Sequence, residues 1–220
     1  MNRLRIFCEG ISDQMFLADF IELTYGISFT RYVSKEKKIK ITCQNQNLDF
    51  EIIEIGGCSK LKTDIWKNEL KKNNAQKIVN LIFFDADFKD QEKGNNGYAS
   101  CYRKLEALKK EVEFEYYIWP DNNSDGEIED LLISLIPQQN LAIFDCMKNL
   151  QNCLASISIP DITIQKSSLK EFINHYYYLT TGNSKLKERD YKNGLFWSIL
   201  NNDQEYLLKL KTTLDLYVTI

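Results

Sequence analysis

The chain has 220 residues, with 28 Lys and Arg against 31 Asp and Glu, so its formal net charge at pH 7 is −3. Hydrophobic residues make up 44% of the chain and aromatic residues 12%, a composition typical of a folded globular protein and not of a disordered one. The sequence pI of about 5.4 excludes a domain that binds nucleic acid through bulk positive charge, because such domains usually have a pI above about 9.

Several other classes are disfavoured by the residue pattern. No apolar run approaches the roughly 20 residues of a membrane span, and the start of the chain lacks the apolar core of a signal peptide. We therefore expect a cytoplasmic protein with reduced cysteines and no membrane partner. No cysteine pair has C-x-x-C spacing, which disfavours a structural zinc site. The single histidine, His175, leaves little support for Ser-His-Asp chemistry.

Strand and helix patterns alternate over the first 136 residues. The strands are expected at 3–8, 48–55, 77–84 and 113–119, with a short alternating segment at 39–41. The helices are expected from a cap at Ser12 or Asp13 to Leu23 and at 61–70, 98–112 and 127–136. This alternation predicts an α/β fold with a largely parallel sheet.

From Pro137 onward the pattern is mostly helical, with helices expected at 141–154, 167–179 and 206–217. We therefore expect an α/β domain over 1–136 and a helical C-terminal extension over 137–220. No internal repeat and no flexible linker separates them, so the extension is expected to pack on the domain as one compact unit.

Acidic residues recur where the predicted strands end. Glu9 follows the first strand, Asp85 and Asp87 follow the most apolar one, and the ten residues 121–130 contain five acids and no base. Ligands of open parallel sheets bind outside the carboxyl ends of the strands. The topology would therefore bring these distant acids together.

Clustered carboxylates without histidine or thiolate partners suit Mg²⁺ or Mn²⁺, which prefer oxygen ligands. The same acids also have purely structural explanations. Glu9 precedes Gly10 and suits a turn, while Asp13 suits a helix N-cap. Glu127, Glu129 and Asp130 lie in a first helical turn, where acids are favoured by the helix dipole. It is their joint placement at several strand ends that favours a site.

Residues 121–126 also match the first half of an EF-hand calcium loop, D-x-N-x-D-G. The twelfth position of that loop requires a bidentate Glu, and here it is Leu132. The segment before the loop reads as a strand and Pro120, where an EF-hand has a helix. EF-hand calcium binding is therefore disfavoured.

Two motifs resemble those of TOPRIM domains. Residues 5–13 (RIFCEGISD) resemble the opening motif, a hydrophobic strand followed by Glu-Gly-x-x-Asp and a helix. Residues 81–87 (LIFFDAD) resemble the second motif, a hydrophobic strand ending in Asp-x-Asp. Residues 120–132 (PDNNSDGEIEDLL) further resemble a small bacterial family related to the TOPRIM domains of overcoming-lysogenization-defect nucleases. The resemblance covers about the first 135 residues.

The resemblance implies a Rossmann-like TOPRIM fold, with a mainly parallel central sheet flanked by helices, and Mg²⁺- or Mn²⁺-dependent phosphodiester chemistry. By motif, Glu9 would be a general acid/base or metal ligand and Asp13 would join it as a catalytic residue. Asp85 and Asp87 would bind metal. Glu129 would complete the metal set, with Glu127 or Asp130 as the alternative match. The helical part after Pro137 matches no well-known member.

Three hypotheses follow. The leading one is a metal-dependent nuclease or related phosphotransfer enzyme acting on DNA or RNA, with backbone contacts from the basic segments 35–40, 60–72 or 185–192. The second is a catalytically silent TOPRIM-like module that binds nucleic acid or a partner protein. The third, a phosphatase or receiver domain with an Asp nucleophile, is disfavoured because Glu9 stands after the first strand.

Overall fold

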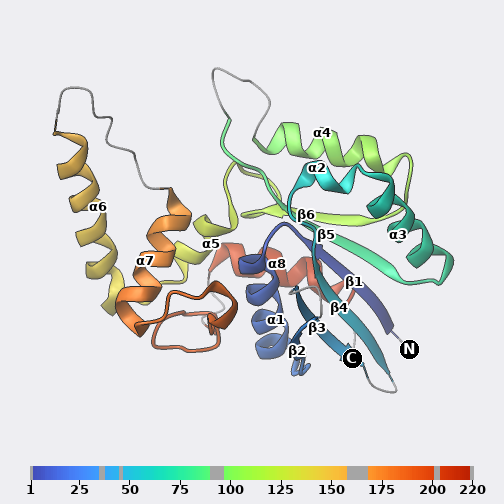
Figure 1. The fold of residues 1–220 in the computed structure, drawn as a ribbon, viewed down its shortest axis with the longest axis horizontal. Coiled ribbons are helices and arrows are strands. Elements are labelled where there is room, and N and C mark those ends of the chain that lie inside the picture. The colour runs from blue at the N-terminus through green and yellow to red at the C-terminus, as the bar shows by residue number, and fades with distance from the viewer. Residues whose placement is uncertain are drawn as a thin grey trace.

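The computed structural model describes residues 2–34, 38–44, 47–89, 97–157, 168–200 and 204–218. Its centre is a six-stranded sheet in the order β2-β3-β4-β1-β5-β6 (Figure 1). The strands are β1 (Asn2–Cys8), β2 (Thr30–Val33), β3 (Ile39–Gln44), β4 (Leu48–Glu54), β5 (Val79–Asp85) and β6 (Glu115–Trp119).

Strands β4, β1, β5 and β6 run parallel, whereas β3 pairs antiparallel with β4 and β2 pairs antiparallel with β3. The fold is thus mixed α/β with a mostly parallel sheet, as the alternation predicts. The sequence pattern shows β3 only as a short alternating segment and does not show β2. Strand β2 is four residues long and mostly exposed at the edge of the sheet, so it lacks the apolar alternation that marks a buried strand.

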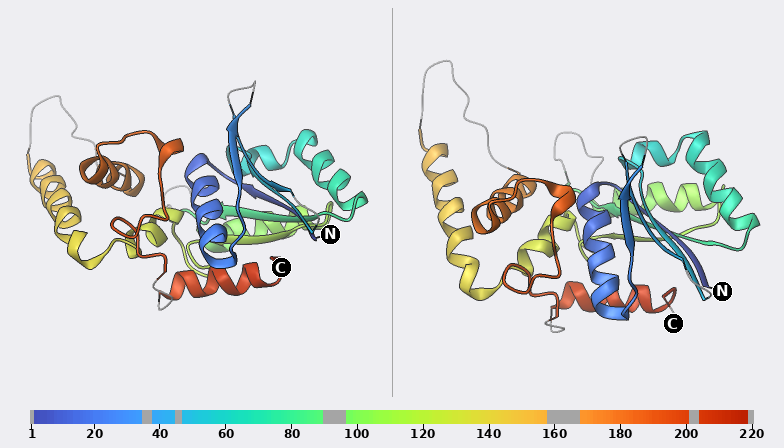
Figure 2. Two further views of the ribbon diagram at one scale, coloured as in Figure 1. Left: turned by 90° about the horizontal axis from the view of Figure 1, so that it is seen from below. Right: turned by 60° about the horizontal axis from the view of Figure 1, so that its bottom comes forward.

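Helices cover both faces of the sheet (Figures 1 and 2). Helices α2, α3 and α4 lie on one face, α1 and α8 lie on the other, and α6 and α7 extend beyond one end. Their bounds are α1 (Ile11–Tyr25), α2 (Cys58–Leu61), α3 (Asp64–Ala75), α4 (Tyr98–Lys109), α5 (Ile128–Ser134), α6 (Leu141–Ala155), α7 (Leu169–Thr181) and α8 (Glu205–Asp215). Short 3₁₀ helices η1 (Gln138–Asn140) and η2 (Leu186–Glu188) complete the described elements.

Two apolar clusters, one on each side of the sheet, follow from the alternation of side chains along the strands. Leu81 and Phe83 of β5 belong to the cluster beneath α1, whereas Ile82 and Phe84 belong to the cluster beneath α3 and α4. Strand β5 is therefore apolar on both faces, which is why its sequence is a continuous hydrophobic run.

The part after Pro137 shares the larger cluster with the α/β part. Phe16 of α1 contacts Tyr191 edge-on, with ring centroids 5.4 Å apart, and Leu210 of α8 is fully buried in the same cluster. A buried carboxylate adds a polar link: Asp19 of α1 accepts a hydrogen bond from the Tyr191 backbone N–H at 2.8 Å and pairs with Arg31 of β2 at 2.7 Å.

Helix α1 begins two or three residues earlier than the sequence pattern predicts. Gly10 is the N-cap, in extended backbone geometry, so neither Ser12 nor Asp13 is the cap. Asp13 instead lies in the first turn and accepts a hydrogen bond from the Gly10 backbone N–H at 3.2 Å. It stabilises the helix start from inside the helix, which is the reciprocal half of a capping box.

Among the described residues, no helix is long and apolar enough to cross a membrane. Segment 35–37, at the start of the basic stretch 35–40, lies outside the described residues.

Truncating Phe84 to Ala should lower the free energy of unfolding by about 3–5 kcal/mol, because its ring is fully buried in β5 and the cavity would be lined by packed neighbours. The matched control is Phe88→Ala, four residues along, where the ring is 51% exposed. Urea unfolding of both variants checks this. Equal losses of unfolding free energy in the two variants would contradict the assignment of β5 to the centre of the core.

Candidate functional site

A small pocket of about 160 Å³ opens where β1 and β5 end and α5 begins. Because β1 and β5 are neighbouring parallel strands, their carboxyl ends lie at the same edge of the sheet. Most of the residues that line the pocket are acids, namely Glu9, Asp13, Asp85, Glu127 and Glu129. The other lining residues are Gly10, Ser12, Ile128 and Lys170.

The backbone of Glu9 is positioned by a hydrogen bond from the loop that follows β4. The backbone N–H of Gly56 donates to the carbonyl of Glu9 at 2.9 Å, which extends the β1–β4 ladder by one step. Gly57 follows with a φ of +113°, a conformation that favours glycine. A Cβ at Gly57 would stand 3.7 Å from Glu9 Oε1, so this loop passes directly beside the carboxylate.

Asp13 is the most enclosed acid of the pocket, with 4% of its surface exposed. Its Oδ1 accepts a hydrogen bond from Trp119 Nε1 at 3.0 Å, across the end of β6. Burial, reinforced by the charge of Glu129, raises the pKa of Asp13 to about 7. The two hydrogen bonds from Gly10 and Trp119 support the ionised form and limit that rise.

Asp85 connects the end of β5 to the start of α5. Its Oδ1 accepts the backbone N–H of Ile128 at 2.8 Å, so the two segments are joined across 43 residues of sequence. Burial is the main cause of a strongly raised pKa for Asp85, and the charges of Asp13 and Glu129 add to it. The charges of the pocket carboxylates therefore disfavour one another's ionised forms, in surroundings that are largely buried.

The turn before α5 sets the direction of its acids. Gly126 has a φ of +143°, and a Cβ there would lie 2.7 Å from Asp130 Oδ2. Asp130 uses that oxygen to accept the Glu127 backbone N–H at 2.8 Å. Of the three alternatives Glu127, Glu129 and Asp130, the first two line the pocket, and Glu127 is also the N-cap of α5. Asp130 lies in the first turn and is engaged by the Glu127 N–H.

Glu127 and Glu129 also have raised pKa values. Burial, followed by the charge of Glu129, raises the pKa of Glu127 to about 6. Burial raises the pKa of Glu129, whose side chain is almost fully enclosed, while Lys170 and Arg189 oppose the rise. Glu9 follows the same pattern: burial and the charge of Asp87 raise its pKa.

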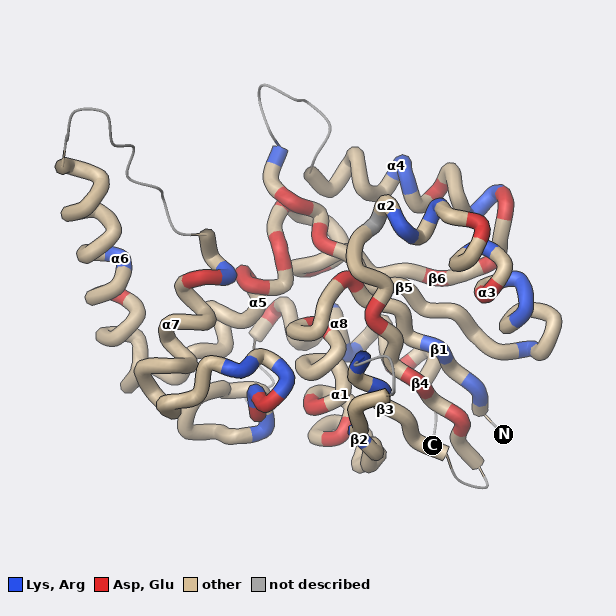
Figure 3. Tube along the Cα trace, in the orientation of Figure 1, with Lys and Arg blue, Asp and Glu red and all other residues tan. Residues whose placement is uncertain are grey.

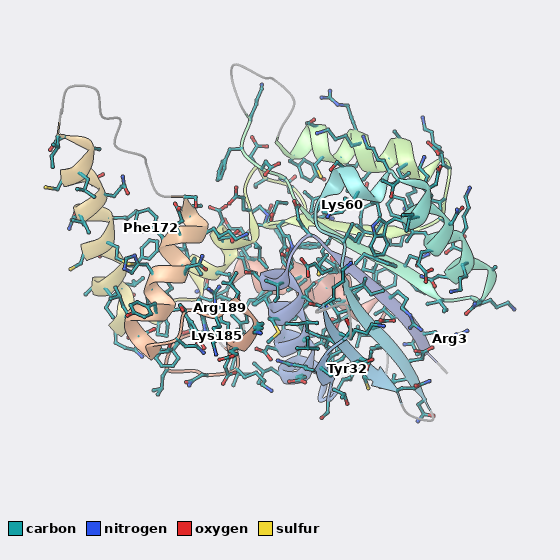
Figure 4. The ribbon with its side chains drawn as sticks, viewed as in Figure 1. Arg3, Tyr32, Lys60, Phe172, Lys185 and Arg189 are labelled. Atoms are coloured by element: carbon teal, nitrogen blue, oxygen red, sulfur yellow. The ribbon has the colours of Figure 1, made fainter. Side chains whose placement is uncertain are left out.

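The helical part supplies the cations that face these acids. Lys170, in the first turn of α7, lines the pocket. Arg189 lies between α7 and α1 (Figure 4). Arg189 is buried and donates to Asn174 Oδ1 at 2.7 Å. Sequence reasoning did not single out Lys170. One local signal was present, because a lysine in a first helical turn is disfavoured by the helix dipole.

Asp87 lies outside the pocket lining. It is exposed, has a φ of +59°, and its carbonyl accepts the Gly126 backbone N–H at 3.1 Å. It reaches the site only through its charge, which raises the pKa values of Glu9 and Glu127. Two other acids of segment 121–130 have structural partners: Asp121 pairs with Lys209, and Asp125 accepts the Tyr98 backbone N–H.

The pocket suits a hard divalent cation by its donor chemistry, because carboxylate oxygens converge there and repel one another in the absence of positive charge. The side chains are not preassembled around one point, however. Within the described residues, no three His, Cys, Asp or Glu side chains are placed so that they could hold one metal ion together. A bound metal would therefore have to draw these carboxylates closer.

A family model described as "Protein of unknown function (DUF3226)" matches residues 4–218. The chain belongs to this family. The match spans both the α/β part and the helices after Pro137, so the matched part of this chain contains Lys170 as well as the acidic strand ends.

Solved structures add a likeness of fold. A hypothetical protein of Pyrococcus horikoshii OT3 is 14% identical, with a TM-score of 0.57, and the alignment covers 97% of this chain and 96% of that one. The C-terminal region of the Burkholderia pseudomallei OLD protein is 13% identical, with a TM-score of 0.44, covering 99% and 100%. The first likeness shows a shared fold, and the second carries no further inference. None of the curated proteins compared with the chain matches it.

The raised pKa of Asp13 predicts a pH dependence of stability. Between the ordinary carboxyl pKa near 4 and the folded value of about 7, the folded state binds more protons than the unfolded state, so stability falls as the pH rises through that window. We expect Asp13→Asn to reduce this fall by about 1 kcal/mol or more between pH 5 and pH 8. Urea unfolding in EDTA measures the difference, with Glu113→Gln at an exposed carboxyl as the control. An unchanged pH slope in Asp13→Asn would contradict the buried, repelled carboxyl.

Proposed function

We propose that the acidic pocket binds Mg²⁺ or Mn²⁺ and that the protein is a metal-dependent phosphodiester hydrolase of the nuclease type. One observation supports this above the others: five carboxylates from three separate elements, β1–α1, β5 and α5, line one pocket of about 160 Å³. The TOPRIM-like motifs contain three of these acids, Glu9, Asp13 and Asp85, which gives the proposal an independent basis in the sequence.

Asp85 and Glu129 would hold the metal, with Glu9 and Glu127 completing the set. When bound, the cation would neutralise the pocket and polarise a phosphate oxygen. Asp87 would act from outside the pocket lining, where its charge already influences Glu9.

Glu9 and Asp13 are the residues proposed to move protons. Asp13 has a pKa of about 7 and lies beside Glu9, so it can exchange a proton near neutral pH. Trp119 fixes the Asp13 carboxyl through the indole N–H, which leaves Glu9, in the pocket lining beside Gly57, to orient an attacking water.

Lys170 is proposed to contact the substrate phosphate. It lies at the pocket from the side of α7, and its charge lowers the pKa values of Glu9, Glu127 and Glu129. A cation in that position attracts a phosphate that the carboxylates alone would repel.

Replacing Asp85 with Asn should abolish Mn²⁺-dependent cleavage of DNA or RNA while leaving the fold intact, because the amide oxygen can still accept the Ile128 N–H. The control is Asp125→Asn, which changes an acid that also accepts a backbone N–H, from Tyr98, outside the pocket. Gel assays on labelled single- and double-stranded substrates check both variants. Full activity in Asp85→Asn, with Asp125→Asn equally active, would refute the mechanism.

A second candidate is a catalytically silent module that binds nucleic acid or a protein partner. The observation in its favour is that the carboxylates within the described residues do not form a ready ligand set for one metal ion. In that case the wild-type protein would bind nucleic acid but show no cleavage with Mg²⁺ or Mn²⁺ in the same gel assay.

A further inference from the structure

A second cleft lies outside the acidic pocket, between α4 and the α2–α3 segment. It has a volume of about 350 Å³. Basic groups dominate its lining, and Figure 3 shows Lys and Arg gathered along α2, α3 and α4. The charged side chains that line it are Lys62, Lys67, Arg103, Lys104 and Glu111.

The cleft keeps a net positive charge. Its carboxylate, Glu111, is already neutralised by Lys67, whose Nζ lies 2.7 Å from Glu111 Oε2. Lys62 and Arg103 are exposed, and neither has an ion-pair partner within the part of the chain that the structure describes. The positive charge of this cleft contrasts with the net charge of −3 of the whole chain.

The length of the cleft suits an extended anion. Its lining follows α4 from Ser100 to beyond the helix end at Glu111, and at 1.5 Å of rise per residue that path is roughly 16 Å long. A single phosphate would occupy only a fraction of this length. A chain of successive phosphates fits this length better, with Lys62 and Arg103 as the cations of the lining that have no ion-pair partner within the described residues.

The cleft is also connected to the acidic pocket. The backbone N–H of Gly97, the N-cap residue of α4, donates to the carbonyl of Ala86 at 2.9 Å, between Asp85 and Asp87 in the sequence. The start of α4 therefore lies beside the acidic end of β5, and Lys104 of the same helix interacts with the charge of Asp87. A polyanion bound in the cleft would extend toward the pocket where the proposed chemistry takes place.

We propose that the cleft between α4 and the α2–α3 segment binds the phosphodiester backbone of nucleic acid and directs the strand toward the acidic pocket. The binding itself stands on the charge and length of the cleft, and only the direction toward the pocket rests on the proposed function. Recognition through backbone phosphates is independent of sequence and weakens with salt, because binding releases condensed counterions.

The test is fluorescence anisotropy with a short labelled DNA duplex and a single-stranded RNA of equal length, in EDTA, over roughly 50–200 mM salt. We expect Lys62→Gln/Arg103→Gln to weaken binding about tenfold at the lowest salt and to reduce the slope of log K against log salt by about 2. The control is Lys148→Gln on α6, an exposed lysine at the other end of the molecule (Figure 1), which should bind like wild type.

Each outcome decides the proposal. It is overturned if wild-type protein binds neither nucleic acid, if the double variant binds like wild type, or if Lys148→Gln weakens binding equally. Displacement by poly-glutamate as effective as by unlabelled DNA would also overturn it, because the cleft would then bind acidic protein. Because every binding measurement is made in EDTA, metal chemistry does not contribute to this readout, and a failure of the proposed hydrolase activity leaves it unaffected.

Discussion

The acidic pocket depends on one physical constraint: like charges are held together in a partly buried place. Burial and mutual repulsion raise the pKa values of Asp13, Asp85 and Glu129. The fold tolerates them because N–H donors face them, from Gly10 and Trp119 at Asp13 and from Ile128 at Asp85. Such an arrangement lowers the stability of the free protein and favours any cation that enters, which is the physical basis of the proposed metal site.

Strand pairing and one glycine turn bring these carboxylates together. Parallel pairing of β1 with β5 brings two strand ends to one edge, and the glycine turn at Gly126 starts α5 against the same edge. The part of the chain after Pro137 adds Lys170 to the pocket lining and Arg189, whose charge lowers the pKa of Glu129. The α/β part and the helical part both contribute side chains to the pocket, and the family model spans both.

Much of this arrangement could be predicted from the sequence, because it depends on strong local patterns. The apolar run of β5 and the acids after it placed Asp85 at a strand end, and parallel topology predicted that Glu9 would be near. Contacts that depend on the packing of segments far apart in the chain could not be predicted from the sequence. Lys170 meets the pocket only through the packing of α7 on α5, and Asp87 turns outward because its backbone adopts a left-handed conformation. The cap of α1 was misplaced because glycine leaves no side-chain signal.

The most direct test of the account is calorimetric titration of the metal-free protein with Mn²⁺ near pH 6.5, in two buffers of different ionisation enthalpy. Metal ligands must be deprotonated, and several pocket carboxyls have raised pKa values, so binding should release protons and the apparent heat should differ between the buffers. Fewer protons should be released at pH 8. Absence of saturable Mn²⁺ binding, or binding with the same heat in both buffers, would contradict the account.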